Sequence, residues 1–241
     1  MKGKLSVLSI IAGHSMGKVF WILLLLPVAN VILFYFSLSE HYQVLYRILD
    51  DLPFTTAFAV AFGAVSVFLC GALRDRGGRQ NNFLDRLRIS PKAIYWNQVG
   101  YNALCYFLLF AVEALSLLGL AFWNCSLFPE SCNHQTLMLD CYRTSILHVF
   151  FPLSDWLGWA ALAVLIPGLG ICTAAFPAKQ RRGKRSVTTF LMCLAAVIYV
   201  YMQVSSHALF PDGKIIILIS GVLLSLIAAG GVLSWEVTED G

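Results

Sequence analysis

The sequence has very little charge for its size. Of its 241 residues, 12% are charged and 59% are hydrophobic, whereas a soluble domain carries about 25% charged residues. A protein of this composition cannot cover its surface with groups that water solvates. The shortage of charge therefore excludes an ordinary soluble domain and indicates an integral membrane protein.

The sequence also lacks a complete phosphate-binding loop. Residues 12–19, AGHSMGKV, approach the motif G-x-x-x-x-G-K-[ST]. However, Ala12 replaces the first glycine, and Val19 replaces the hydroxyl residue that would bind magnesium. We therefore expect no ATPase activity and no cofactor in this chain. If the protein is a transporter, ATP and Mg²⁺ bind to a partner ATPase subunit.

Motifs of metal-dependent or catalytic sites are missing from the apolar segments. They contain neither H-E-x-x-H nor a comparable pair of ligands. We therefore expect no metal ion and no catalytic residue. A less favoured alternative is an intramembrane enzyme centred on Glu113, His148 and Asp155.

What the sequence does contain is six long apolar segments. A helix needs about 20 apolar residues to cross the hydrocarbon core of a bilayer. The segments lie at about 19–36, 54–73, 99–123, 149–176, 187–204 and 215–235. They predict an all-α integral membrane protein with six transmembrane helices in a single domain, residues 1–241.

The basic residues are distributed unequally between the segments that connect these spans. Three Lys or Arg residues precede the first span, six lie in the second loop and five in the fourth, whereas the other connections hold three in all. Basic residues are retained on the cytoplasmic side during insertion. We therefore expect both termini in the cytoplasm, membrane lipid as a partner, and no nucleic acid.

Some segments have patterns of their own. Within residues 1–18, Leu5, Leu8 and Ile11 recur at helical spacing, which predicts an amphipathic interfacial helix or an extended start of the first span. Pro152 and Pro167 interrupt the fourth apolar segment and predict an interfacial start or a kink. Small residues at helical spacing favour close contacts, within the chain or in a dimer. They are Ala57, Ala61 and Ala64 in span two and Gly221, Ser225, Ala228 and Ala229 in span six.

The second loop, residues 74–97, has the most informative pattern. A polar turn, RDRGGRQNN, is followed by FLDRLRISPKAIYWNQ. Phe83, Leu84 and Leu87 mark a short amphipathic helix. Ser90 and Pro91 then predict the capped start of the helix that becomes span three.

With six spans, an amphipathic start and this second-loop element, the chain resembles the membrane subunit of ATP-binding-cassette (ABC) exporters of the second type. The resemblance covers the whole chain in hydropathy and the second loop in motif. In that family the loop carries a cytoplasmic coupling helix that docks on the ATPase subunit. The resemblance implies that this role belongs to Phe83, Leu84, Arg86, Leu87, Arg88 and Ile89.

The resemblance also implies a function and an assembly. The chain would be a permease in the bacterial cytoplasmic membrane that moves an amphiphilic cargo, such as an antimicrobial peptide, a lipid or a drug. Its partners would be an ABC ATPase subunit and a second permease, either another copy or a paralogue. The alternative is a membrane assembly or immunity subunit that transports nothing, because such a subunit would share these sequence features.

Four further residues are candidates for a functional or structural role. Glu113 lies near the middle of span three, where an ionised side chain is costly. It either lines a translocation path or is hydrogen-bonded by a neighbouring helix, through Ser116 or Tyr106. Cys125, Cys132 and Cys141 lie in the third loop, expected outside the cell, where one pair could form a disulfide.

Overall fold

The computed structural model describes residues 2–40, 48–50, 52–71, 90–129, 134–152, 155–181, 186–205 and 211–234. Within these ranges helix is the only regular secondary structure. The helices are α1 (Lys2–Glu40), α3 (Leu52–Gly71), α5 (Pro91–Leu127), α6 (His134–Arg143), α7 (Ser145–Phe150), α8 (Trp156–Arg181), α9 (Val187–Ser205) and α10 (Pro211–Leu233). Helices α1, α3, α5, α8, α9 and α10 are each long and apolar enough to cross a membrane. The predicted all-α fold with six candidate membrane-spanning helices is confirmed.

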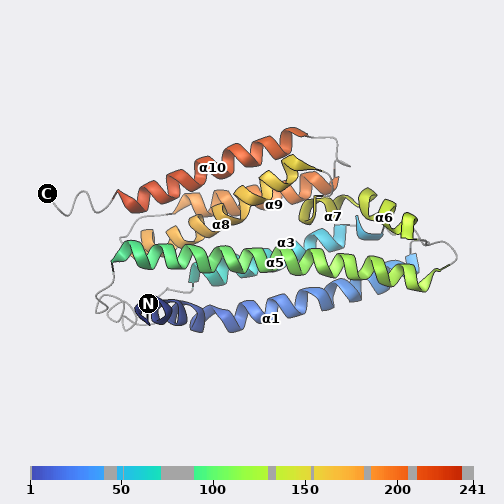
Figure 1. Ribbon diagram of the computed structural model, residues 1–241, viewed down its shortest axis with the longest axis horizontal. Helices are drawn as coiled ribbons and strands as arrows, with labels where there is room; N and C mark the ends of the chain where they lie inside the picture. Colours follow the sequence, from blue (N-terminus) through green and yellow to red (C-terminus); the bar gives the residue numbers. More distant parts are fainter. Residues whose placement is uncertain are drawn as a thin grey trace.

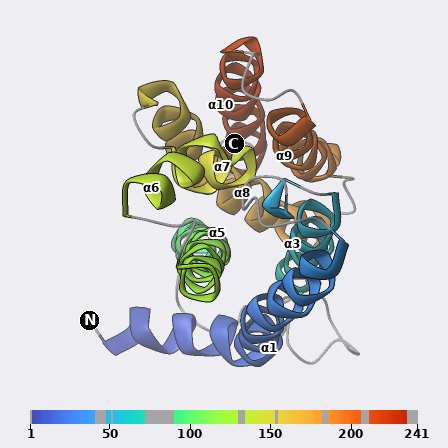
Figure 2. The ribbon, with the colours of Figure 1, turned by 90° about the vertical axis from the view of Figure 1, so that its right-hand side faces the viewer.

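The six long helices form one bundle (Figures 1 and 2), in which α8 contacts α3, α5, α9 and α10. Helix α5 packs mainly against α8 and α1, and α10 packs against α8 and α9. The starts of α1, α5 and α9 and the ends of α3, α8 and α10 lie at the same end of the bundle (Figure 1). Helices α6 and α7 lie at the opposite end. The segments that sequence analysis found rich in basic residues therefore all connect to one end.

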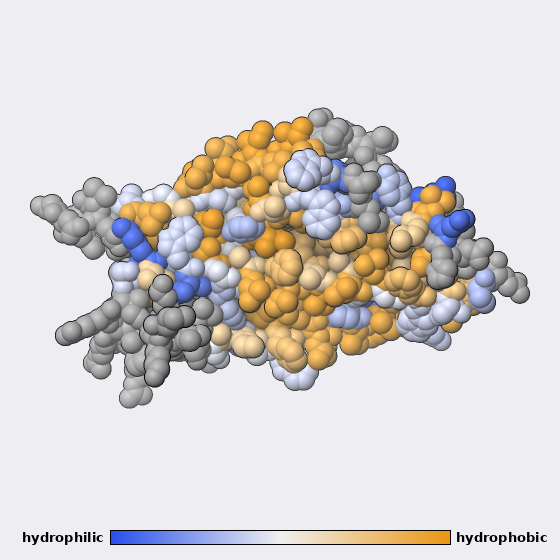
Figure 3. Space-filling model, viewed as in Figure 1, coloured by the Kyte–Doolittle hydropathy of each residue, from blue (hydrophilic) through white to orange (hydrophobic). Residues whose placement is uncertain are grey.

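The outside of the bundle is apolar. Figure 3 shows hydrophobic side chains over the middle of one face, with hydrophilic ones near the two ends. Large apolar side chains point outward from several helices, among them Trp21, Val60 and Leu226, which are 61%, 72% and 64% exposed. Bilayer hydrocarbon covers such a belt.

Helix α1 is longer than the first span predicted at 19–36. It runs without interruption from Lys2 to Glu40, through Pro27, and its candidate membrane span is Ser15–Leu38. Its first turns lie across the long axis of the bundle before the helix turns along it (Figures 1 and 2). The segment predicted as an interfacial helix is thus helical and continuous with the span.

The fourth span begins later than predicted. The expected start at residue 149 is wrong, because α7 ends at Phe150 and α8 begins at Trp156. Proline disfavours a helical conformation in the residue before it and has no N–H for the helical bond. Pro152 therefore separates the short helix α7 from the span, whereas Pro167 lies inside α8.

The predicted start of the helix that enters span three is confirmed. Helix α5 begins at Pro91, and the Ser90 side chain accepts a hydrogen bond from the backbone N–H of Ala93 at 3.3 Å. The helix then continues for 37 residues without a break, which is about 55 Å. The coupling-helix residues predicted at 83–89 lie outside the described residues.

Small residues allow close contacts between the helices of one chain. A Cβ atom at Gly221 of α10 would lie 3.0 Å from Cγ1 of Val164, and one at Gly168 of α8 would lie 2.8 Å from Oγ of Ser225. The small-residue face predicted on span six therefore packs against α8. On α3, Ala57, Ala61 and Ala64 line a groove of about 460 Å³ beside α1.

Candidate functional site

Buried polar side chains connect α5 to three other helices. Towards α1, the Oγ atom of Ser15 and the hydroxyl of Tyr101 are 2.9 Å apart. Towards α3, the hydroxyl of Tyr106 donates to Oγ of Ser66 at 2.9 Å. The Asn102 amide donates to Oγ1 of Thr173 on α8 at 3.0 Å. A displacement of α5 would therefore act on α1, α3 and α8 together.

Of the carboxyl groups that the structure describes, the most deeply buried one belongs to this set of contacts. Glu113 is 0% exposed, and so is Asn30 of α1. The Asn30 Nδ2 atom donates to Oε2 of Glu113 and to Oγ of Ser116, both at 2.9 Å. Ser116 in turn donates to the backbone carbonyl of Glu113 at 2.9 Å. Glu113 thus faces the α1–α5 contact in this arrangement.

Sequence reasoning missed Asn30 as the partner of Glu113. It named Ser116, which belongs to the same network, and Tyr106, which instead donates to Ser66. A signal was available, because Asn30 is the only amide residue in the apolar segment predicted at 19–36. That Glu113 lines a translocation path stays a prediction.

Two oxygen atoms of this network have no hydrogen-bond partner among the described residues. They are Oδ1 of Asn30 and Oε1 of Glu113. A buried polar atom without a partner costs about 1–3 kcal/mol. Two such atoms in one hydrogen-bonded pair therefore make this part of the α1–α5 contact energetically costly.

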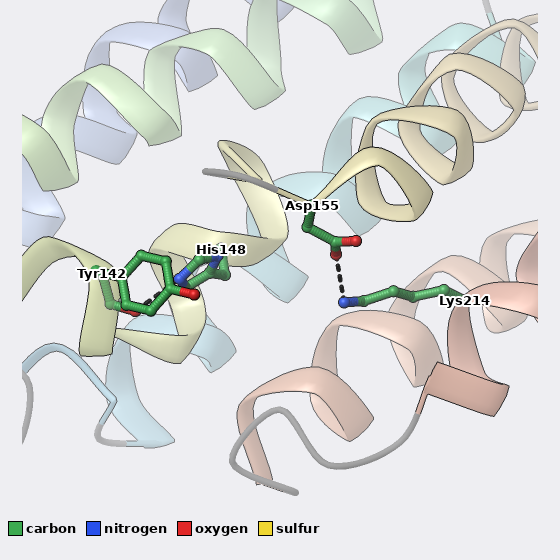
Figure 4. A network of polar contacts seen from close by, with 4 residues as sticks. All are labelled: Tyr142, His148, Asp155 and Lys214. Atoms are coloured by element: carbon green, nitrogen blue, oxygen red, sulfur yellow. Dashed lines mark hydrogen bonds and ion pairs between the residues drawn. The ribbon is translucent and has the colours of Figure 1, made fainter.

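The three residues of the enzyme alternative are held by different partners. Whereas Glu113 is bound by Asn30, the Nε2 atom of His148 lies 2.6 Å from the backbone carbonyl of Tyr142. Asp155 forms an ion pair with Lys214 (Figure 4). Among the described residues, no three His, Cys, Asp or Glu side chains are grouped so that they could hold a metal ion.

Asp155 connects the starts of α8 and α10. Its carboxylate accepts hydrogen bonds from Lys214 and from the backbone N–H groups of Leu157 and Gly158. Burial acts to raise the pKa of Asp155, but these hydrogen bonds and the lysine charge outweigh it and hold the pKa below its usual value. The aspartate therefore both caps α8 and ties it to α10.

We expect Asp155→Asn to destabilise the protein by about 0.5–1 kcal/mol, since it removes the ion pair but retains a capping side chain. Asp155→Ala should cost about 1 kcal/mol more. The contribution of the wild-type pair is present above about pH 4 and is lost as the pH falls through the lowered pKa. Thermal unfolding in detergent between pH 3 and pH 7 would measure both effects. Equal acid sensitivity of wild type and Asp155→Asn would contradict the assignment.

A second capping carboxylate, Asp50, was not singled out from the sequence. Its Oδ2 and Oδ1 atoms accept hydrogen bonds from the backbone N–H groups of Ser145 and Ile146, each at 3.1 Å. These N–H groups belong to the first turn of α7, where a negative charge is favourable. Asp50 therefore attaches α7 to the segment that precedes α3.

The three cysteines predicted in the third loop differ in state. Cys125 is disulfide-bonded, whereas Cys141 is a free, buried thiol. Burial raises the pKa of Cys141, with Asp140 adding to the effect. Cys132 lies outside the described residues.

A cavity of about 580 Å³ lies between α3 and α9, near the end of the bundle where α5 begins. Its lining mixes hydroxyl and thiol groups with aromatic and aliphatic side chains. The polar contributors include Ser66, Cys70, Ser186, Thr189 and Cys193, and the aromatic ones are Phe62, Phe176 and Phe190. A cavity of this size and mixed character suits an amphiphilic molecule.

The fold and these buried contacts define an all-helical, multi-pass membrane protein. Comparison with protein-family models, with curated proteins and with solved structures finds no match for this chain.

Proposed function

We propose that this protein is the membrane subunit of an ATP-driven exporter in the cell membrane, working with an ABC ATPase subunit and a second permease. The observation that carries the proposal is the continuity of α5. This helix starts at the Ser90 cap, directly after the second loop, and runs for 37 residues to the opposite end of the bundle. It is therefore suited to carry a displacement from the loop through the membrane.

The mechanism follows from the contacts of α5. ATP-driven closure of the ATPase subunits would push on the second loop and, through it, on the start of α5. Because α5 shares buried hydrogen bonds with α1, α3 and α8, its movement would carry these helices with it. Switching between two arrangements of packed helices is the usual form of such a transition.

The orientation in the proposal comes from charge. The second and fourth loops and the N-terminal segment contain most of the basic residues of the chain, and the helices that flank them meet at one end of the bundle. Retention of basic residues in the cytoplasm makes this the cytoplasmic end, with both termini there. The second loop would then be accessible to a cytoplasmic ATPase.

The cavity between α3 and α9 supports an amphiphilic cargo. It lies towards the proposed cytoplasmic end, where cargo would be taken up, and its lining is mainly apolar with a few hydroxyl and thiol groups. Such a surface binds a molecule with a large apolar part and a small polar part. A lipid, a drug or an antimicrobial peptide side chain meets that description.

Co-expression with the ABC ATPase subunits of the source organism, followed by affinity purification, tests the proposal. We expect one ATPase to co-purify and Leu84→Asp or Leu87→Asp to reduce its recovery at least tenfold. A charge in an apolar docking contact costs more than the roughly 1.4 kcal/mol that this factor represents. Gln80→Asp, which makes the same charge change in the polar turn of the loop, is the matched control.

Three outcomes would contradict the proposal. If no ATPase co-purifies, or if the Leu84 and Leu87 variants retain it as well as Gln80→Asp does, then the second loop is not a docking element. If the complex hydrolyses ATP but moves no fluorescent lipid, drug or cationic peptide across proteoliposomes, the protein is a subunit that binds an ATPase without transporting these cargoes.

A further inference from the structure

The hydrogen-bond donors of the Asn30–Glu113 pair are all in use, while two acceptors are not. An asparagine amide has two N–H groups, and Nδ2 of Asn30 uses them on Oε2 of Glu113 and on Oγ of Ser116. The hydroxyl of Ser116 is donated to the backbone carbonyl of Glu113. The atoms without partners, Oδ1 of Asn30 and Oε1 of Glu113, are both acceptors when the carboxyl group is ionised.

An ionised Glu113 would also lack a counter-charge among the described residues. Within the described part of the chain, the neutral amide of Asn30 is the only side chain hydrogen-bonded to this carboxyl group. An isolated carboxylate is costly to bury in an apolar interior or a bilayer, and the usual response is to take up a proton. The missing hydrogen-bond donor and the missing counter-charge therefore both indicate that Glu113 takes up a proton.

A single proton on Oε1 would neutralise the carboxyl group and supply the missing hydrogen-bond donor. A protonated carboxyl group has one O–H donor, and the amide of Asn30 presents an unused carbonyl oxygen on the same planar group as its bound nitrogen. We propose that Glu113 binds a proton through Oε1 and donates it to Oδ1 of Asn30, so that a cyclic acid–amide pair clasps α1 to α5. The N–H contact of 2.9 Å to Oε2 is the other half of this ring.

The titratable groups on the helices packed around this pair are engaged elsewhere or lie near helix ends. On α1, Lys18 lies 5.2 Å from the ring centre of Phe68. On α7, His148 contacts the carbonyl of Tyr142. The described parts of α3 and α7 contain no Asp, Glu, Lys or Arg. The remaining charged residues of α1, α5 and the helices in contact with them are Lys2, Lys4 and Glu40 on α1, Lys92 on α5, Asp140 and Arg143 on α6, and Lys179 and Arg181 on α8.

The tyrosine and cysteine side chains around the pair have other neighbours. Tyr95 donates to the backbone carbonyl of Ile171, Tyr101 pairs with Ser15 and Tyr106 donates to Ser66. Tyr35 of α1 is 71% exposed on the outside of the bundle. The free thiols on packed helices are Cys70, Cys105, Cys141 and Cys172. Proton binding is thus assigned to Glu113 alone.

Infrared spectroscopy of the purified full-length protein tests the protonation state directly. We expect a C=O stretching band of a protonated carboxylic acid at pH 7 that is absent from Glu113→Gln and shifted in Asn30→Leu. Glutamine keeps the ring, because its N–H can donate to Oδ1 of Asn30, so this variant should fold. Ser116→Ala is the control, since it leaves both atoms of the ring in place and should retain the band.

Unfolding at different pH values in mixed detergent micelles gives a second readout. Above about pH 4 the unfolded glutamic acid loses its proton while the folded one keeps it, so the wild type becomes less stable as the pH rises. Relative to Glu113→Gln, its unfolding equilibrium constant should increase by up to about tenfold per pH unit between pH 5 and the pH at which folded Glu113 ionises. Asn30→Leu should unfold more readily than wild type at every pH.

Three results would overturn the proposal. The first is an infrared spectrum in which Glu113→Gln removes a carboxylate band and no acid band at pH 7. The second is a ratio of wild-type to Glu113→Gln unfolding constants that stays the same between pH 5 and pH 8. The third is stabilisation of the wild type by Na⁺ at constant pH and ionic strength, which would assign the two free oxygen atoms to a cation.

Discussion

Replacing Gly170 with leucine is expected to force α5 away from α8 and to destabilise the protein by about 3 kcal/mol or more, at or beyond the upper end of the usual cost of overpacking. A Cβ atom at Gly170 would lie 2.9 Å from Cβ of Ala103, 3.0 Å from its backbone nitrogen and 3.0 Å from the carbonyl oxygen of Val99. Two of these atoms belong to the α5 backbone, which cannot yield as a side chain can. Unfolding in mixed micelles would measure the loss.

Gly119→Ala is the matched control for this prediction. Gly119 lies on α5 and is exposed, and a Cβ atom there would have no neighbour within 4 Å. Alanine should therefore be neutral or slightly stabilising, because it favours helix by about 1 kcal/mol relative to glycine. Equal stability of Gly170→Leu and Gly119→Ala would show that α5 and α8 do not approach as closely as the structure has them.

Replacing Phe58 with alanine is expected to destabilise the protein by about 3 kcal/mol. The ring centre of Phe58 lies 4.6 Å from that of Phe150 on α7, 5.3 Å from that of Phe110 on α5 and 6.1 Å from that of Phe62. Because lipid is itself apolar, moving the ring from lipid into the bundle gains little hydrophobic free energy. Most of the lost stability therefore comes from the cavity and the missing ring contacts. The free energy of unfolding and proteolysis near α7 would report it.

Val60→Ala, two residues away on the same helix, provides the comparison. Val60 is 72% exposed, so its shortened side chain would leave no cavity. We expect this variant to unfold within about 0.5 kcal/mol of wild type. If Phe58→Ala is as mild as Val60→Ala, the aromatic cluster does not hold α7 on the bundle.

Several features of the fold follow from local sequence and were predictable. Six apolar segments indicate six spans because a bilayer requires every backbone hydrogen bond to be made within a helix. Ser90 and Pro91 predict the start of α5 because capping involves atoms only a few residues apart. The predicted span at 187–204 agrees closely with α9, Val187–Ser205, since no proline or charged residue interrupts it.

The start of the fourth span was predicted less well. Residues 149–152 are apolar enough to continue the span, and hydropathy cannot tell a short helix at the end of a bundle from the first turn of a long one. Asp50 caps α7 from a distant part of the chain, at 95 and 96 residues of separation. That contact, together with Pro152, makes α7 a separate helix.

The candidate site, too, could be predicted from the sequence only in part. The sequence alone predicts a six-span helical membrane protein with a costly carboxyl group in span three. These features are predictable because hydropathy and charge are properties of each segment. The partner of that carboxyl group, Asn30, is 83 residues away, and the contact at Gly170 depends on α5 and α8 meeting at that point. Such contacts arise from the packing of whole helices, so only the folded bundle could reveal which atoms of Glu113 and Asn30 are paired and which have no partner among the described residues.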